Sequence, residues 1–168
     1  AIYEQILAAN PRHFDALHLS GVVAHQTGNH ARAVELIDRA IKVNGQIADA
    51  HSNRGLALKE LQRFEEAIAS YDRALALAPD DIEVLTNRGI ALYDLKQYQD
   101  ALKPLQEASR MEGGMNIEIY DHLADVLMAL GRKEEARKAY ALGIELASSS
   151  RRDQSKKIEV ENKIKAIK

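Results

Sequence analysis

A small residue returns every 34 positions along this chain. Gly21, Gly55 and Gly89 are each 34 residues apart, and Ala124 follows 35 residues after Gly89. Two further small positions keep this step, in the series Ala33, Ala67, Ala101, Ala136 and the series Ala40, Ala74, Ala108, Gly143. Such a period predicts a stack of similar units, because one unit of this size cannot bury its apolar face alone. Stacked repeats present an extended surface to a partner, so we expect binding and no enzymatic activity.

The composition indicates what builds the core and which partners are disfavoured. Of the 168 residues, 46% are hydrophobic but only 5% are aromatic, so Ala, Leu and Ile must form most of the core. The 23 basic and 25 acidic side chains give a formal net charge of −2, which supplies no general attraction to nucleic acid. We therefore expect no nucleic-acid partner. The chain has no cysteine, which excludes disulfides and thiolate metal sites.

Membrane insertion is not expected, since no run of the sequence approaches the roughly 20 apolar residues that span a bilayer. The chain begins inside a helical pattern and without Met, which indicates a piece of a longer protein. A chain without cysteine suits the cytoplasm and the periplasm. The compartment therefore stays open, with the cytoplasm favoured.

The segment 48–81 shows how one unit is organised. Its first part has apolar residues at helical spacing up to Leu61, and the pattern breaks at 62–64. Its second part opens with acidic residues, which suit a helix N-terminus, and stops before Pro79. This predicts one helix hairpin per unit. Because small side chains allow two helices to approach closely, we expect Gly55 to face Ala67.

These residues resemble the motif of the tetratricopeptide repeat (TPR) family. The matching positions are the small residues Gly55, Ala67 and Ala74, the aromatic residues Phe64 and Tyr71, and Pro79. The resemblance implies an all-α fold, a right-handed α-solenoid of TPR helix hairpins, as a single domain over 1–168. We divide it into a half repeat at 1–13, full repeats at 14–47, 48–81, 82–116 and 117–150, and a C-terminal capping helix at 151–168.

Both ends of the stack should differ from its middle. The run 148–150 is all serine and marks a break, as the connector Gly113–Gly114 does within the third repeat. The last helix should cover the final hairpin with Ile158, Ile164 and Ile167. At the other end, the half repeat leaves apolar residues without their own first helix, so self-association through this N-terminal edge is one expected mode of interaction.

The resemblance also implies that the first helix of each repeat lines a concave groove, and that the groove binds an extended peptide or a segment of a partner protein. Carrying the family's groove positions onto this sequence gives a candidate binding site. Its residues are His18, Val22, His25, Asn53, Leu56, Lys59, Glu83, Asn87, Ile90, Tyr93, Asp94, Asp121, His122 and Asp125.

The chemistry of these positions predicts what the groove prefers. Its C-terminal half gathers Glu83, Asp94, Glu118, Asp121 and Asp125, with Lys59 as the only obvious cationic neighbour. This favours a basic or neutral protein or peptide. An alternative explanation stays open, because acidic residues in a first helical turn are also favoured by the helix dipole. Asn53 and Asn87 can bond a peptide backbone, since an amide both donates and accepts.

Other functions are either disfavoured or remain as alternatives. The positions at which some TPR proteins grip a chaperone's terminal carboxylate hold His18, Val22, Asn53, Glu83 and Asn87, which lack the required cations, so we reject that function. The segment 50–60 resembles the repeats of O-linked N-acetylglucosamine transferases, which leaves a substrate-recruiting arm of a glycosyltransferase as an alternative, beside a self-assembly module.

The histidines do not predict chemistry of their own. His18 and His25 lie two helical turns apart, about 10 Å, too far to share one ion without a third element. Neither has a partner at catalytic spacing. We expect no cofactor, no metal and no catalytic residue.

Overall fold

The computed structural model describes residues 2–111, 116–147 and 151–167, and every regular element in these ranges is a helix. The helices of the first part of the chain are α1 (Ile2–Ala9), α2 (Phe14–Gln26), α3 (His30–Val43), α4 (Ala48–Glu60) and α5 (Phe64–Leu77). The later helices are α6 (Ile82–Asp94), α7 (Tyr98–Arg110), α8 (Ile117–Ala129), α9 (Lys133–Leu146) and α10 (Arg151–Ala166). The predicted all-α class is confirmed. The expected connectors at 113–114 and 148–150 lie outside the described residues.

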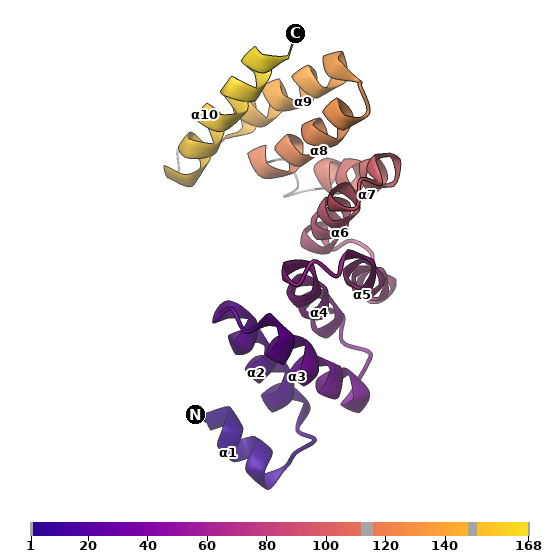
Figure 1. Cartoon of the computed structure of the whole chain (residues 1–168), viewed down its shortest axis with the longest axis vertical. Coiled ribbons are helices and arrows are strands. Elements are labelled where there is room, and N and C mark those ends of the chain that lie inside the picture. The colour runs from indigo at the N-terminus through magenta and orange to yellow at the C-terminus, as the bar shows by residue number, and fades with distance from the viewer. Residues whose placement is uncertain (1, 112–115, 148–150, 168) are drawn as a thin grey trace. The chain divides into compact units, whose positions relative to one another are not determined.

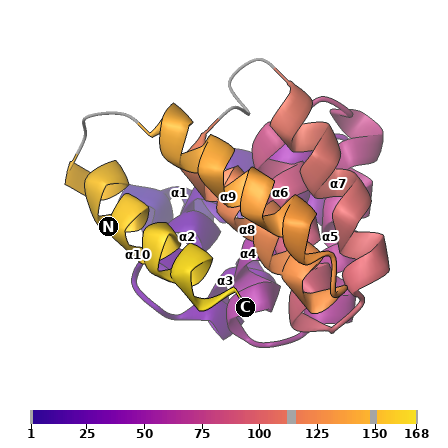
Figure 2. The same cartoon turned by 90° about the horizontal axis from the view of Figure 1, so that it is seen from above.

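The helices form two compact units, 1–79 with α1 to α5 and 80–168 with α6 to α10. In the first unit, α2 pairs with α3 and α4 with α5, while α3 also packs against α4 (Figure 1). The second unit repeats this arrangement with α6 and α7, then α8 and α9, and α7 packs against α8 (Figure 2). Each unit is thus a stack of helix hairpins, as the 34-residue period predicts.

Four of the turns between paired helices share one backbone conformation. The second residue after each first helix has a positive φ: 80° at Gly28, 59° at Gln62, 61° at Lys96 and 74° at Gly131. In each turn the next residue donates its N–H to a carbonyl in the last turn of the helix, as Arg63 does to Leu58 at 2.9 Å. This left-handed cap satisfies carbonyls that the helix end leaves unpaired.

Within the hairpins, the repeated glycine faces a large side chain. A Cβ added to Gly55 would overlap the ring of Tyr71, which is fully buried. The corresponding Cβ at Gly89 would lie 2.6 Å from Cγ of Leu105. The side chain nearest to Gly55 is therefore that of Tyr71, which the expected contact with Ala67 did not include. The glycine admits a bulky residue of the partner helix, which fills the core better than two small side chains would.

The C-terminal helix α10 packs on α9 and also on α8, in the same way as α8 contacts both α7 and α6. Its buried residues include Val160, which is 0% exposed, and Ile167 follows the helix and is also buried. The expected contact residue Ile158 is instead 62% exposed, so this part of the prediction is wrong. The packed face follows Lys156, Val160, Lys163 and Ile167, which are spaced at helical intervals, and it includes two charged side chains.

None of the described helices is both long enough and apolar enough to cross a membrane.

Candidate functional site

The first helices of the hairpins carry the predicted groove residues. In the first unit, α2 provides His18, Val22 and His25, and the neighbouring α4 provides Asn53, Leu56 and Lys59. All six are half-buried.

Asn53 and His18 join α2 to α4 directly. Nδ2 of Asn53 lies 3.0 Å from Nε2 of His18. An amide nitrogen can only donate, so Nε2 accepts and the ring is neutral. Burial, opposed by the charges of Asp49 and Asp15, lowers the pKa of His18 and keeps it in this form. Part of the hydrogen-bonding capacity of Asn53 is therefore used within the protein.

His25 forms a second contact at the end of α2. Its Nδ1 lies 3.1 Å from Nδ1 of His30, the first residue of α3. Burial and the neighbouring His30 lower the pKa of His25. These contacts place both predicted histidines of the first unit in structural roles, in which they link helices.

In the second unit, a pocket of about 580 Å³ lies between α6 and α8. It brings together four of the predicted residues: Glu83, Asn87, Ile90 and His122. Thr86 and Glu118, which also occupy groove positions of the repeat, line it too, and the other lining residues are Ile82, Asn116 and Ile119. We call this cavity the α6–α8 pocket.

The α6–α8 pocket combines acidic groups with apolar walls. Glu83 is exposed and Glu118 half-buried, and neither lysine nor arginine is among the described lining residues. Burial lowers the pKa of His122, with the nearby Lys156 acting in the same direction, so the ring is neutral near pH 7. The pocket therefore suits a group that is cationic at one end and apolar along its stem.

The other two acidic residues of α8, Asp121 and Asp125, are paired with lysines of the chain itself. Asp121 is 1% exposed, and Lys156 Nζ lies 2.6 Å from its Oδ2. Lys163 Nζ lies 2.7 Å from Oδ1 of Asp121 and 2.8 Å from Oδ2 of Asp125. The sequence prediction that only Lys59 offers a cation to the acidic groove residues is wrong, because α10 supplies two lysines.

The α10 lysines stay charged in this position. Burial alone would lower the pKa of Lys163, but hydrogen bonds to Asp121 and Asp125 outweigh it and raise the pKa. Tyr140 also donates to Asp125, and burial together with this contact raises the pKa of the phenol. The predicted groove residues Asp121 and Asp125 thus belong to a network that holds α10 on α8.

Asp121, His122 and Asp125 also have the spacing of a metal site, with possible ligand atoms within 4.8 Å of one another. The ammonium of Lys163 lies between the two carboxylates at hydrogen-bonding distance. A cation is therefore already supplied by the chain itself, and the cluster gives no reason to infer a metal ion.

Two predicted residues lie near the end of α6. Tyr93 packs against Tyr98, with ring centroids 5.3 Å apart, and burial and then Asp125 raise its pKa. Asp94 is the exposed last residue of the helix. Neither lines the α6–α8 pocket.

Sequence reasoning missed three lining residues of the α6–α8 pocket, namely Ile82, Asn116 and Ile119. A signal existed for each of them. Ile82 and Ile119 lie one helical turn before Thr86 and His122. Asn116 precedes an apolar helix and caps it, since its side chain accepts the N–H of Ile119 at 3.0 Å.

Antiparallel helix hairpins that recur at a 34-residue step define a helical-repeat protein, a class that presents extended binding surfaces. Models of the tetratricopeptide repeat match residues 1–50, 48–81, 70–103 and 117–150. These matches together span more than half of the sequence, and the chain belongs to the tetratricopeptide repeat family. Among the curated proteins, none matches it.

Solved structures share the fold at low sequence identity. MamA of Desulfovibrio magneticus RS-1 aligns with a TM-score of 0.82 and 19% identity, over 88% of this chain and 84% of that one. TTC0263, a thermophilic TPR protein of Thermus thermophilus, aligns with a TM-score of 0.76 and 20% identity, over 95% of this chain and 87% of that one. The first TPR of Spaghetti (RPAP3), bound to the HSP90 peptide SRMEEVD, aligns with a TM-score of 0.67 and 21% identity, over 70% of this chain and 93% of that one. TPR domains are in general protein-interaction modules and not catalysts.

Proposed function

We propose that this chain is a non-enzymatic scaffold that binds an extended peptide, or a segment of a partner protein, along its first helices. The α6–α8 pocket then holds a lysine or arginine side chain of that segment. The observation that carries this proposal is the gathering of Glu83, Asn87, Ile90 and His122 around one cavity of about 580 Å³.

The lining of the pocket suits such a side chain along its whole length. The stem of a lysine or arginine is apolar and packs on Ile82, Ile90 and Ile119, while the charged end reaches Glu83 or Glu118. Asn87 can bond the backbone of the segment, because its amide both donates and accepts. A neutral segment would use only the apolar part of this lining and would bind more weakly.

The sign of the charge distinguishes this site from that of a structural relative. The peptide in the RPAP3 complex, SRMEEVD, contains three acidic residues. Here Glu83 and Glu118 would repel such a peptide in the α6–α8 pocket. We therefore expect a basic segment to bind there and an acidic one to be excluded.

Fluorescence anisotropy with dye-labelled oligo-lysine and oligo-glutamate peptides, at low and high salt, tests this proposal. The double variant Glu83→Gln/Glu118→Gln should weaken oligo-lysine binding about tenfold at low salt, since two partly exposed ion pairs of about 0.5–1 kcal/mol each are lost. The matched control Glu65→Gln/Glu145→Gln removes two exposed acids that do not line the pocket and should bind like the unaltered chain. Oligo-lysine binding that is as tight in the Glu83→Gln/Glu118→Gln variant as in the unaltered chain would end the proposal.

Self-association through the N-terminal edge is a second proposed mode of interaction. Ile2 of α1 is 73% exposed and Val23 of α2 is 46% exposed, whereas Leu7 packs against the core formed by Leu17 and Leu36. Light scattering over a range of concentrations tests it, and a mass that stays at the monomer value at every concentration would exclude it.

A further inference from the structure

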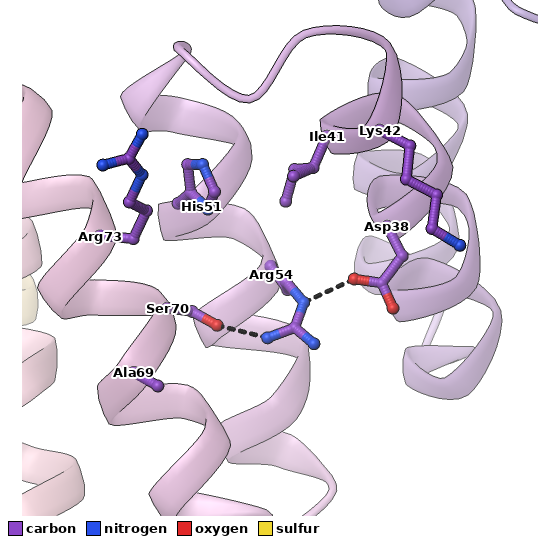
Figure 3. Close-up of a pocket in the computed structure, with 8 residues that line it drawn as sticks. All are labelled: Asp38, Ile41, Lys42, His51, Arg54, Ala69, Ser70 and Arg73. Carbon is purple, nitrogen blue, oxygen red and sulfur yellow. Dashed lines mark hydrogen bonds and ion pairs between the residues drawn. The ribbon is translucent and has the colours of Figure 1, made fainter.

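The second helices of the first unit carry a basic surface. A pocket of about 390 Å³ lies where α3, α4 and α5 meet (Figure 3). We call it the α3–α5 pocket. Its lining residues are Asp38, Ile41, Lys42, His51, Arg54, Ala69, Ser70 and Arg73. Three of them are lysine or arginine and one is acidic, so the α3–α5 pocket has an excess of positive charge.

The centre of the α3–α5 pocket is rigidly built. Arg54 Nε lies 2.6 Å from Oδ1 of Asp38, and its Nη1 donates to Ser70 Oγ at 2.7 Å (Figure 3). Asp38 therefore neutralises Arg54. His51, which is 8% exposed, is held by a 3.0 Å contact between Nε2 and the carbonyl oxygen of Gly45. Lys42 and Arg73 provide the charge that this framework leaves uncompensated.

A second pocket, of about 280 Å³, continues the basic surface. It is lined by Pro11, Arg12, Leu17, Arg39, Lys42 and Val43, with three cations and no acidic residue among the described lining. Lys42 lines both pockets. Arg39 is positioned by a 3.2 Å hydrogen bond from Nη2 to the carbonyl oxygen of Pro11.

This concentration of charge is not a property of the unit as a whole. Residues 1–79 contain eight lysine or arginine residues and nine aspartate or glutamate residues. Five of the eight cations line the two pockets, but only one of the nine acids does. Separating charges in this way creates a positive local field in a unit that is nearly neutral overall.

We propose that this basic surface of the first unit binds an acidic segment of a partner protein, whose carboxylate or phosphate side chains enter the two pockets. The pockets are small and partly apolar, with Ile41 and Ala69 in one and Leu17 and Val43 in the other. Such pockets fit separate side chains better than a continuous nucleic-acid backbone. The lining residues of both pockets come from α2 to α5 and the connection before α2, so the site shares no residue with the α6–α8 pocket.

Anisotropy with a dye-labelled oligo-glutamate peptide and with a labelled peptide rich in phosphoserine tests this inference. The variant Lys42→Gln/Arg73→Gln changes two exposed side chains outside the Arg54–Asp38 contact, so folding should be unaffected. We expect it to bind whichever acidic peptide binds the unaltered chain about tenfold more weakly at low salt. The control Lys103→Gln/Lys138→Gln, with the same change in net charge on exposed residues of α7 and α9, should bind normally.

Two results would overturn the inference. One is that neither acidic peptide binds the unaltered chain, or that an acidic peptide which does bind is bound as tightly by the Lys42→Gln/Arg73→Gln variant as by the control variant. The other is that a labelled single-stranded RNA binds more tightly than both peptides and loses affinity in the same variant. The first result would leave the α6–α8 proposal intact, because that proposal is tested by oligo-lysine and the Glu83/Glu118 variant.

Discussion

The ammonium nitrogen of Lys163 lies 2.7 Å from Oδ1 of Asp121, a carboxylate that is 1% exposed. Lys156 approaches the other oxygen of the same carboxylate at 2.6 Å. The ion pairs span 42 and 35 residues of sequence, and both lead from α10 to α8. The C-terminal helix is thus held by charge as well as by the apolar contact of Val160.

Removing the buried carboxylate should loosen α10. We expect Asp121→Asn to lower the free energy of unfolding by about 2–3 kcal/mol, because two partly buried ammonium groups lose their strongest partner. Chemical denaturation measures this loss, and hydrogen exchange should show faster exchange of the α10 amides. The control Lys138→Met, on the exposed face of α9, should leave both unchanged. An Asp121→Asn variant as stable as the unaltered chain would contradict a structural role for these ion pairs.

The contact between Gly55 and Tyr71 gives a second prediction. A Cβ at Gly55 would overlap the buried ring, so Gly55→Ala should lower the free energy of unfolding by about 1–3 kcal/mol. At Gly45 the nearest atom to an added Cβ is the carbonyl oxygen of Ile41 at 3.3 Å, a milder contact. Thermal denaturation of the two alanine variants compares them. The packing argument fails if Gly45→Ala is the more destabilised of the two.

The left-handed turn residues give a third prediction, of opposite sign. Gln62 and Lys96 have φ near 60° although they carry side chains. Because glycine adopts this conformation without a steric cost, Gln62→Gly and Lys96→Gly should each raise the free energy of unfolding by up to about 1 kcal/mol. The reverse change, Gly131→Ala, should lower it by a similar amount. Urea denaturation measures all three, and destabilisation by both glycine variants would refute the argument.

Stability should fall on mild acidification. Burial lowers the pKa values of His18, His25 and His122 below the ordinary value of 6.5, so the unfolded chain binds more protons than the folded one in this range. The stabilisation is therefore fully present above pH 6.5 and is lost as the pH falls toward the lower folded values.

His122 provides the direct test of this pH dependence. Lys156 and Lys163 oppose its protonation, while Asp121 and Asp125 favour it, and burial dominates. We expect His122→Gln to flatten the dependence of unfolding free energy on pH between about pH 7 and about pH 5.5. An unchanged slope would show that the ring is not kept neutral by burial.

Much of the architecture follows from local pattern. The spacing of Gly21, Gly55 and Gly89, with the breaks between apolar runs, is enough to predict hairpins and their length. Contact partners are harder to predict. The pattern predicts small residues at the hairpin crossing but not the close approach of the Tyr71 ring to Gly55. It also favours Ile158 over Val160 for the buried face of α10, because apolar character alone does not say which face a neighbouring helix covers.

The predicted binding residues also divide into those that the structure brings to a pocket and those that other side chains cover. Glu83, Asn87, Ile90 and His122 are all selected by their positions in the repeat, and the structure brings them to one pocket. Asp121 and Asp125 are selected by the same rule, but lysines of α10 cover them. The basic surface around Lys42 is not predicted, since its residues lie mostly on second helices and the first unit is nearly neutral overall.

The sequence by itself determined the helices, their pairing in hairpins and the family, because these depend on periodic side chains a few residues apart. Only the tertiary structure decided which charges are neutralised and which remain open to a partner. That outcome depends on residues distant in sequence, such as Lys163 over Asp121 and Arg54 between Asp38 and Ser70. Charge pairing is set by distance in space, which a linear pattern does not contain.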